Sequence, residues 1–257
     1  MVKLVIFITK KLVRTHIIAS ALTILLMYYA PNAALAQADQ FSAERNRMVE
    51  NDLIARNISD PAVLKAMGNV RRHLFVDKSL WHEAYADYPL PISDGQTISQ
   101  PYIVALMTQS LKLKKADKVL EVGTGSGYQA AVLAEIVQQV YSIEIVKALA
   151  EKAQKLLRSL GYRNINIKTG DGYRGWKEYA PYDAIIITCA VNHVPAPLIN
   201  QLRDGGRIVL PLGDSGIFSQ RLMLGTKKNG TLELQHITGV RFVPMVGESQ
   251  KKASGRE

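Results

Sequence analysis

The sequence has 257 residues, of which 47% are apolar and 21% charged, with 32 Lys and Arg against 22 Asp and Glu. This is the composition of a globular protein, and the length is enough for one sizeable α/β domain or two small ones. The single cysteine excludes an intramolecular disulfide, CxxC redox chemistry and a zinc site built from thiolates.

The first residues have the features of an export signal. Four basic residues accompany an uncharged, mostly apolar stretch at residues 17–30, and Ala34-Leu35-Ala36 matches a small-x-small cleavage site. The apolar stretch is short for a membrane span, which needs about 20 residues. We therefore predict a signal peptide at residues 1–36, a periplasmic or secreted protein, and no stable membrane insertion after cleavage. The alternatives are a retained membrane anchor or a cytoplasmic protein whose start is misread.

Removal of that segment takes four basic and no acidic residues, so the net charge falls from +10 to +6. The remaining basic residues are dispersed along the chain, apart from a short cluster at Lys112–Lys118. This pattern is more typical of solvated surfaces than of phosphate binding, so we expect no nucleic-acid partner.

Helices and loops are predicted before the first long strand. Residues 37–57 indicate an amphipathic helix, and Asp60-Pro61 opens a short one with Asp60 as N-cap. Another helix is predicted to start at Pro101, preceded by Ser99 or Gln100, with Ser99 as the better N-cap. The polar loop 94–101 that precedes this helix has several donors, which could instead clamp a carboxylate.

Residues 119–128 read Val-Leu-Glu-Val-Gly-Thr-Gly-Ser-Gly-Tyr. A short apolar run, three glycines and a helix-compatible stretch predict a strand, a tight turn and a helix, which is half of a Rossmann unit. Glycines let the backbone approach a ligand closely, and the helix N-terminus offers free N–H groups.

The spacing and the acids indicate which ligand binds there. The dinucleotide fingerprint is G-x-G-x-x-G, whereas this turn is G-x-G-x-G and follows Glu121, which suits a cationic ammonium or sulfonium group. The next strand ends in Glu144, placed to hold two ribose hydroxyls. We therefore predict S-adenosylmethionine as the cofactor; an NAD-linked oxidoreductase or a ligand-free turn is the alternative. The predicted contacts are Glu121, Gly123, Thr124, Gly125, Ser126, Gly127 and Glu144.

Strands and helices then alternate along the chain. We predict strands at 139–144, 164–168, 182–188 and 207–212 and helices at 146–160 and 196–203. This order predicts a largely parallel sheet covered on both faces. Two apolar segments, Arg221–Gly225 and Leu232–Val240, flank a turn that contains Asn229-Gly230 and predict a hairpin. Residues 247–257 are predicted to be a disordered tail.

Four further features bear on the chemistry of the chain. Asp171 and Gly172 follow a strand at the same sheet edge, where Asp171 could accept from an adenine amino group or simply form a turn. The histidines lack metal-ligand spacing, so no metal is expected. The protease-like Gly213–Gly216 is interpreted as a turn, and Cys189 as a small buried hydrophobic residue.

Seven stretches together resemble bacterial protein-L-isoaspartate O-methyltransferases. They are Arg72–Val76, Gln96–Tyr102, Val119–Tyr128, Gly170–Gly172, Ala180–Thr188, Leu202–Pro211 and Arg241–Pro244. The resemblance covers about residues 45–245. It departs from the family at Cys189, where the family often has Ala, and in the export signal, since S-adenosylmethionine is made in the cytoplasm.

The resemblance implies an α/β fold: a Rossmann-like class I methyltransferase with a seven-stranded, mostly parallel sheet and helices on both faces. An N-terminal helical and substrate-loop region would span residues 37–115, and the cofactor-binding core residues 116–246, with a C-terminal antiparallel hairpin. We expect a monomer.

It also implies methyl transfer to the α-carboxylate of L-isoaspartyl residues in damaged proteins and peptides, with S-adenosyl-L-homocysteine as the product. Ser99 matches the active-site serine, Thr97 and Ile98 the substrate loop, and Val243 and Pro244 the cover over the peptide. A carboxylate is already anionic at neutral pH, so Ser99 would orient it rather than attack. The alternatives are an RNA or small-molecule acceptor, or a non-enzymatic binding module.

Overall fold

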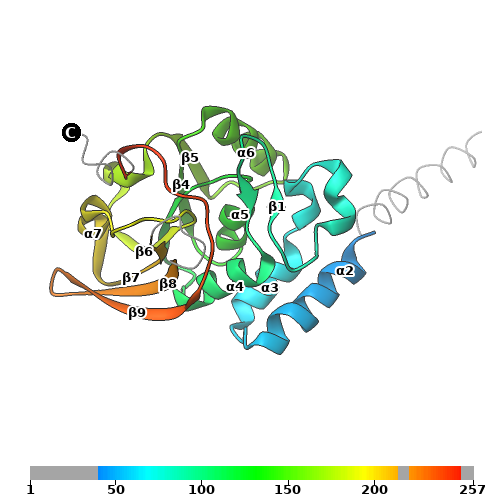
Figure 1. Cartoon of the computed structure of the whole chain (residues 1–257), viewed down its shortest axis with the longest axis horizontal. Coiled ribbons are helices and arrows are strands. Elements are labelled where there is room, and N and C mark those ends of the chain that lie inside the picture. Colours follow the sequence, from blue (N-terminus) through cyan, green and yellow to red (C-terminus); the bar gives the residue numbers. More distant parts are fainter. Residues whose placement is uncertain (1–39, 214–219, 250–257) are drawn as a thin grey trace, which may run out of the picture. The chain divides into compact units, whose positions relative to one another are not determined.

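A computed structural model describes residues 40–213 and 220–249 (Figure 1). The chain divides into two units, residues 1–44 and 45–257, and the fold and site described below belong to the second. The predicted signal peptide, and the predicted tail from residue 250 on, lie outside the described residues. No helix within the described ranges has the length and apolarity that a membrane crossing requires.

The region before the sheet consists of short helices and one small two-stranded sheet. Its elements are α2 (Ser42–Arg47), η1 (Met48–Leu53), η2 (Ile54–Arg56), α3 (Pro61–Asn69), η3 (Arg72–Phe75), η4 (Lys78–Glu83), β1 (Leu90–Pro91), β2 (Thr97–Ile98) and α4 (Pro101–Ser110). Asp60 caps α3 as predicted, because its side chain accepts the N–H groups of Ala62 and Val63. The helix predicted over residues 37–57 is represented in the described residues by α2, the π-helical η1 and the 3₁₀-helical η2, which ends at the left-handed Asn57.

The prediction that Ser99 caps α4 is wrong. Gln100 occupies the N-cap position and makes no side-chain capping bond. The N–H of Tyr102, in the first turn, instead donates to Oδ1 of Asp87 at 2.9 Å. Another segment of the chain therefore supplies the acceptor that the sequence assigned to Ser99.

Seven strands form the main sheet, in the order β5-β4-β3-β6-β7-β8-β9. They are β3 (Lys118–Val122), β4 (Gln139–Glu144), β5 (Ile165–Thr169), β6 (Tyr182–Ile187), β7 (Leu202–Leu212), β8 (Arg221–Lys228) and β9 (Thr231–Gly239). Strands β3 to β7 pair in parallel, and β7, β8 and β9 pair antiparallel. The predicted mostly parallel sheet with a C-terminal hairpin is confirmed. At the hairpin turn, Asn229 and Gly230 both have positive φ, as a type I′ turn requires.

Strand β7 begins five residues before the predicted start at 207, and the preceding helix, α7 (Ala196–Gln201), ends correspondingly early. Leu202 pairs with Tyr182 of β6, and a register shift separates this pair from the regular ladder that begins at Arg207. The polar and glycine residues in between look like a turn in sequence; the structure includes them in β7, at the register shift.

Two more helices connect the parallel strands: α5 (Tyr128–Ala134) between β3 and β4, and α6 (Lys147–Ser159) between β4 and β5. The N-terminal region packs on α5 through Arg72, which is fully buried. Arg72 donates to the carbonyl of Ala84 at 2.8 Å, and its guanidinium lies 4.9 Å from the ring centroid of Tyr128. This contact places the short helices beside the turn between β3 and α5.

After β9 the chain returns to the carboxyl ends of the parallel strands, as the red segment of Figure 1 shows. Ala190, just beyond β6, donates to the carbonyl of Val243 and accepts from the N–H of Met245, both at 2.8 Å. The C-terminal segment is therefore held at the edge of the sheet where ligands bind in open α/β folds.

Candidate active site

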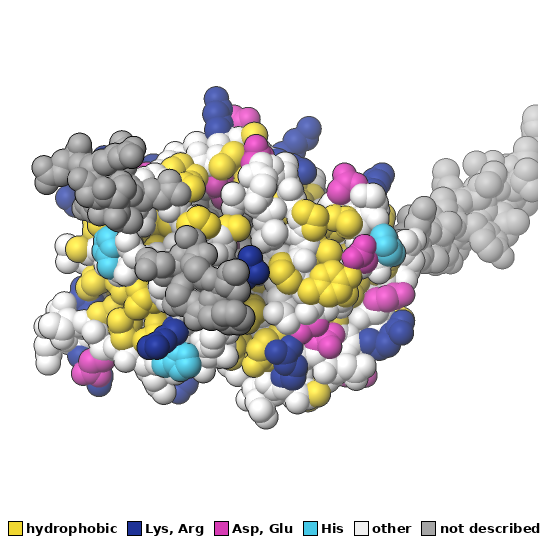
Figure 2. Space-filling model, viewed as in Figure 1, with side chains coloured by type: hydrophobic (Ala, Val, Ile, Leu, Met, Phe, Trp, Pro, Cys, Tyr) yellow, Lys and Arg dark blue, Asp and Glu magenta, His cyan; other side chains and the backbone are white. Residues whose placement is uncertain are grey.

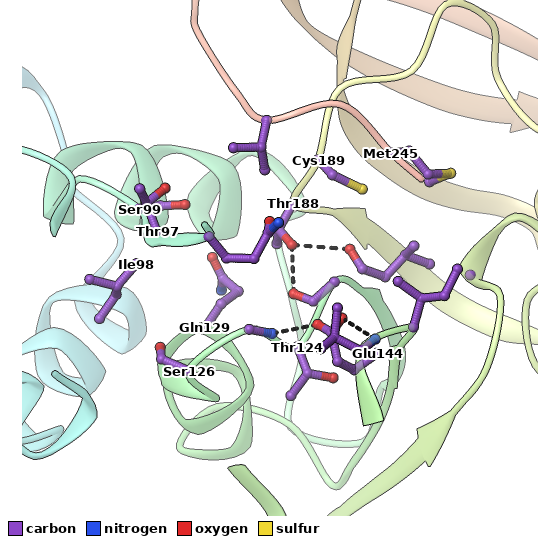
Figure 3. Close-up of a pocket in the computed structure, with 18 of the residues that line it drawn as sticks. Thr97, Ile98, Ser99, Thr124, Ser126, Gln129, Glu144, Thr188, Cys189 and Met245 are labelled. Carbon is purple, nitrogen blue, oxygen red and sulfur yellow. Dashed lines mark hydrogen bonds between the residues drawn. The ribbon is translucent and has the colours of Figure 1, made fainter. Parts of the chain in front are cut away.

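A cavity lies at the carboxyl edge of the sheet, where β3 is flanked by β4 and β6 and the strand order reverses. Its walls come from segments that are far apart in sequence: the loop around β2 with the following α4, the glycine turn, the end of β4, the turn after β5, the end of β6 and the segment after β9. Figure 3 shows Thr97, Ile98 and Ser99 on one side, and Cys189 and Met245 on another. The position is the switch point at which doubly wound sheets bind ligands.

Another side chain of the protein closely approaches the backbone of the glycine turn, and the predicted approach of a ligand stays a prediction. Gly123, Gly125 and Gly127 all have positive φ. A Cβ on Gly123 would lie 2.4 Å from the hydroxyl oxygen of Thr188, which itself donates to the Gly123 carbonyl at 2.6 Å. The side chain of Thr188 thus occupies the space that glycine leaves and ties the turn to the end of β6.

Glu144 fixes the turn to the second strand. Its carboxylate accepts the N–H of Gly125 at 2.8 Å and the N–H of Val146 at 3.0 Å, and the residue lines the cavity (Figure 3). A carboxylate has about four acceptor positions, so capacity remains for ligand hydroxyls. The next residue, Ile145, also lines the cavity and is 38% exposed, which offers an apolar surface beside the acid.

Glu121 lies beneath the cavity rather than on its wall. Side chains alternate along a strand, so Glu121 points away from the face of Val122, which does line the cavity. It meets Ser142, its partner in register on β4, and the Ser142 hydroxyl donates to it. Ser142 is in turn 2.5 Å from the hydroxyl of Thr124, a cavity residue. A chain of two hydroxyl groups thus connects Glu121 to the cavity, and its direct contact with the ligand stays a prediction.

The charge state of Glu121 follows from its burial. The side chain is fully buried, and its Oε1 has no hydrogen-bond partner among the described residues. Burial raises the pKa of Glu121 to about 8, the nearby charge of Glu144 raises it as well, and the Ser142 hydrogen bond opposes both. A cation in the cavity would stabilise its ionised form.

Asp171 and Gly127 also lie behind the wall. Asp171 accepts the N–H of Tyr173 at 3.0 Å and that of Glu248 at 2.8 Å, while Gly172 lines the cavity. Gly127 is the N-cap of α5, and a Cβ there would come 3.1 Å from Leu157 of α6. The structure brings the other predicted cofactor residues together on one wall: Gly123, Thr124, Gly125, Ser126, Glu144 and Gly172.

All five predicted catalytic and substrate residues line the same cavity: Thr97, Ile98, Ser99, Val243 and Pro244. Thr97, Ser99 and Val243 also line an adjoining hollow, whose other residues include Arg241 and Phe242. Among the described residues the Ser99 hydroxyl has no hydrogen-bond partner, so it is free to meet a ligand. A hydroxyl at the junction of two hollows can contact groups bound in both.

Several wall residues were missed by sequence reasoning, because their side chains are unremarkable apolar or neutral groups. They are Val104, Val122, Tyr128, Gln129, Ile143, Ile145, Val146, Thr188, Met245 and Val246. Cys189, predicted to be a buried hydrophobic residue, is partly exposed and lines the cavity as well. Burial raises the pKa of its thiol to about 12, so the thiol is neutral at physiological pH and a poor nucleophile.

Comparisons with known proteins identify relatives along nearly the whole chain. The model of the protein-L-isoaspartate(D-aspartate) O-methyltransferase family matches residues 43–250. Protein-L-isoaspartate O-methyltransferase 2 of Shewanella sediminis is 53% identical over 232 residues, which cover 90% of this chain and 95% of the relative. Protein-L-isoaspartate O-methyltransferase of a Picosynechococcus species is 54% identical, over 82% of this chain and 94% of the relative.

Solved structures of the same type of enzyme also match this chain. A protein-L-isoaspartate O-methyltransferase matches with a TM-score of 0.74 and 31% identity, over 80% of this chain and 67% of the other. A Plasmodium falciparum protein described as the same type of enzyme, in complex with S-adenosyl-L-homocysteine, matches with a TM-score of 0.69 and 26% identity, over 79% of this chain and 98% of the other.

Proposed function

The chain belongs to the protein-L-isoaspartate(D-aspartate) O-methyltransferase family, and from that premise we propose how its own residues carry out the reaction. The protein is a repair methyltransferase: it transfers a methyl group from S-adenosylmethionine to the α-carboxylate of L-isoaspartyl residues in damaged proteins and peptides. The ester closes to a succinimide, which opens partly to normal aspartate. The observation that carries the assignment of residues is that the predicted substrate loop and the glycine turn line one cavity.

The cavity fits S-adenosylmethionine. The glycine turn lines the cavity, and Glu144 retains acceptor positions suited to ribose hydroxyls. Ile145 supplies an apolar surface for the adenine, and a bound cationic ligand would favour the ionised form of the buried Glu121 beneath the turn. When bound, the cofactor supplies a methyl group already activated on a sulfonium.

Ser99 and Thr97 act on the substrate in this proposal. The isoaspartyl carboxylate is anionic at neutral pH, so the site needs no strong general base. The hydroxyl of Ser99 donates to one carboxylate oxygen and directs the other toward the cofactor, while Val243, Pro244 and Met245 exclude water from one side. Catalysis then depends on placement rather than on a change of protonation.

We propose that the protein is exported and monomeric. The basic, apolar and small-residue pattern of residues 1–36 supports export, and removal of that segment would leave a chain with no membrane-crossing helix in its described part. Acidic and basic side chains are interspersed on the face drawn in Figure 2, which supports the expectation of no nucleic-acid partner. Cell fractionation tests export, and the mass of the purified protein shows whether residues 1–36 have been removed. Recovery of the uncleaved protein in the cytoplasm would contradict export.

Methyl transfer from labelled S-adenosylmethionine to paired peptides containing L-isoaspartate or L-aspartate tests the reaction itself. We expect base-labile label on the isoaspartyl peptide alone, because carboxyl methyl esters hydrolyse in base. Transfer to neither peptide by a protein that still binds the cofactor would point to another acceptor, such as RNA or a small molecule.

A further inference from the structure

Helix α4 directly follows the substrate loop, and its first turn lacks a local cap. The first N–H groups of a helix have no partner inside the helix, and they are usually satisfied by the residue at the N-cap. Gln100 holds that position without a capping bond, and Pro101 has no N–H to satisfy. The N–H of Tyr102 is therefore the first one in α4 that needs an acceptor from elsewhere.

Asp87, from the segment between η4 and β1, supplies this acceptor. Its Oδ1 accepts the Tyr102 N–H at 2.9 Å, and its Oδ2 accepts from Nε2 of Gln100 at 2.6 Å. The two bonds hold the backbone of α4 and the side chain of its N-cap residue at the same time. Ser99 is the next residue before Gln100, so its direction depends on how this junction is held.

Arg56 completes the cluster from a third segment. Its Nη1 forms an ion pair with Oδ2 of Asp87, and its guanidinium carbon lies 3.5 Å from the ring centroid of Tyr102. The Asp87 side chain is only 15% exposed, so its bonds are less weakened by water than those of a surface pair. The junction is thus fixed by charge, by hydrogen bonds and by ring stacking.

We propose that Asp87 is a positioning residue for methyl transfer: by capping α4 in place of Ser99, it leaves the Ser99 hydroxyl free to hold the isoaspartyl carboxylate. The inference rests on the proposed function of Ser99. Without Asp87, the unpaired first turn of α4 can draw the Ser99 hydroxyl back toward the helix, which removes a donor from the cavity. The cofactor wall, formed by the glycine turn and Glu144, has no bond to Asp87 and is unaffected.

The test compares Asp87→Ala, Asp87→Asn and a matched capping control in the full chain. Asp60→Ala removes a side-chain cap from α3, a helix whose cap does not line the cavity. For Asp87→Ala we expect the KM of the isoaspartyl peptide to rise about tenfold or more, since a small displacement of a positioning group strongly weakens the contact that it orients. The Kd of S-adenosyl-L-homocysteine should stay within about twofold. Asp87→Asn keeps an oxygen for the Tyr102 N–H and should recover part of the loss.

A purely structural role would lower the melting temperature of Asp87→Ala and Asp60→Ala alike and weaken cofactor and peptide binding in parallel. That result, or an unchanged peptide KM in Asp87→Ala, would overturn the proposal. If Asp87→Ala does not fold, Asp87→Asn decides: a peptide KM at or moderately above the wild-type value with normal cofactor affinity supports the proposal, and a parallel loss of peptide and cofactor binding overturns it. Failure of the wild-type protein to methylate the isoaspartyl peptide would instead contradict the proposed function.

Discussion

Gln220 and Phe242 exchange two hydrogen bonds that hold the C-terminal segment in place. Both residues line the hollow that adjoins the cavity at Ser99. The Phe242 N–H donates to Oε1 of Gln220 at 2.6 Å, and Nε2 of Gln220 donates to the Phe242 carbonyl at 3.1 Å. The backbone carbonyl of Gln220 also accepts from the N–H of Val240 at 3.1 Å. Gln220 is only 4% exposed, so few water molecules could replace these bonds.

The first prediction concerns this pair. Gln220→Leu leaves the N–H and the carbonyl of Phe242 without their partner, at a cost of about 1–3 kcal/mol for each buried group left unpaired. We expect a higher KM for the isoaspartyl peptide, with little change in cofactor affinity. Steady-state kinetics and calorimetry measure both. Gln235→Leu, at an exposed position of β9, is the control. An equal change in the peptide KM of the two variants would refute the role of the Gln220–Phe242 hydrogen bonds.

The second prediction concerns Ser99. Ser99→Ala removes a hydroxyl that has no hydrogen-bond partner among the described residues, so stability should hardly change. Cofactor binding should persist while methyl transfer falls by about two orders of magnitude, the usual effect of losing an orienting donor. Ser93→Ala, at an exposed position of the same loop, is the matched control. Unchanged turnover in Ser99→Ala would remove the proposed role.

The third prediction concerns the glycine turn. Gly123→Ala places a Cβ 2.4 Å from the Thr188 hydroxyl oxygen at a position with positive φ. Gly161 has a similar φ, but nothing lies within 4 Å of an added Cβ. Gly161→Ala should therefore lower the free energy of unfolding only by the backbone strain of about 1–2 kcal/mol. Thermal unfolding and cofactor titration should show a larger loss for Gly123→Ala. Equal losses would mean that backbone strain alone explains the glycine.

The fourth prediction concerns pH and Glu121. Its pKa in the folded protein, about 8, lies above the ordinary value of 4.5. The folded state therefore holds a proton that the unfolded state loses, so this contribution to stability is present below pH 4.5 and is lost as pH rises toward 8. Each pH unit in that window removes up to about 1.4 kcal/mol.

Urea unfolding at pH 5, 7 and 9 measures this slope. Glu121→Gln keeps the shape and cannot ionise, so its stability should fall less between pH 5 and 9 than that of the wild type. Glu151→Gln, at an exposed position on α6, should keep the wild-type slope. If Glu121→Gln retains that slope too, the buried carboxyl is not its source.

Sequence patterns predicted most of the architecture, because it depends on local periodicity and turn chemistry. Strand β4 was predicted at the residues where it lies, and α6 within one residue at each end. The three glycines predicted a tight turn between a strand and a helix, and the structure has this turn, with positive φ at all three glycines. These features are determined by residues that are neighbours in the chain.

The tertiary structure decided where side chains point and which distant group satisfies them. Ser99 resembles an N-cap in sequence, but Asp87 takes that role from another segment, and no local pattern records such a partner. Glu121 resembles a ligand contact, but the alternation of its strand directs it to Ser142, one layer below the cavity. The sequence by itself determined the family, the sheet and the segments of the site. Only packing decided which of their side chains reach the cavity, because burial and hydrogen bonding between distant segments are settled when the sheet and its covering loops come together.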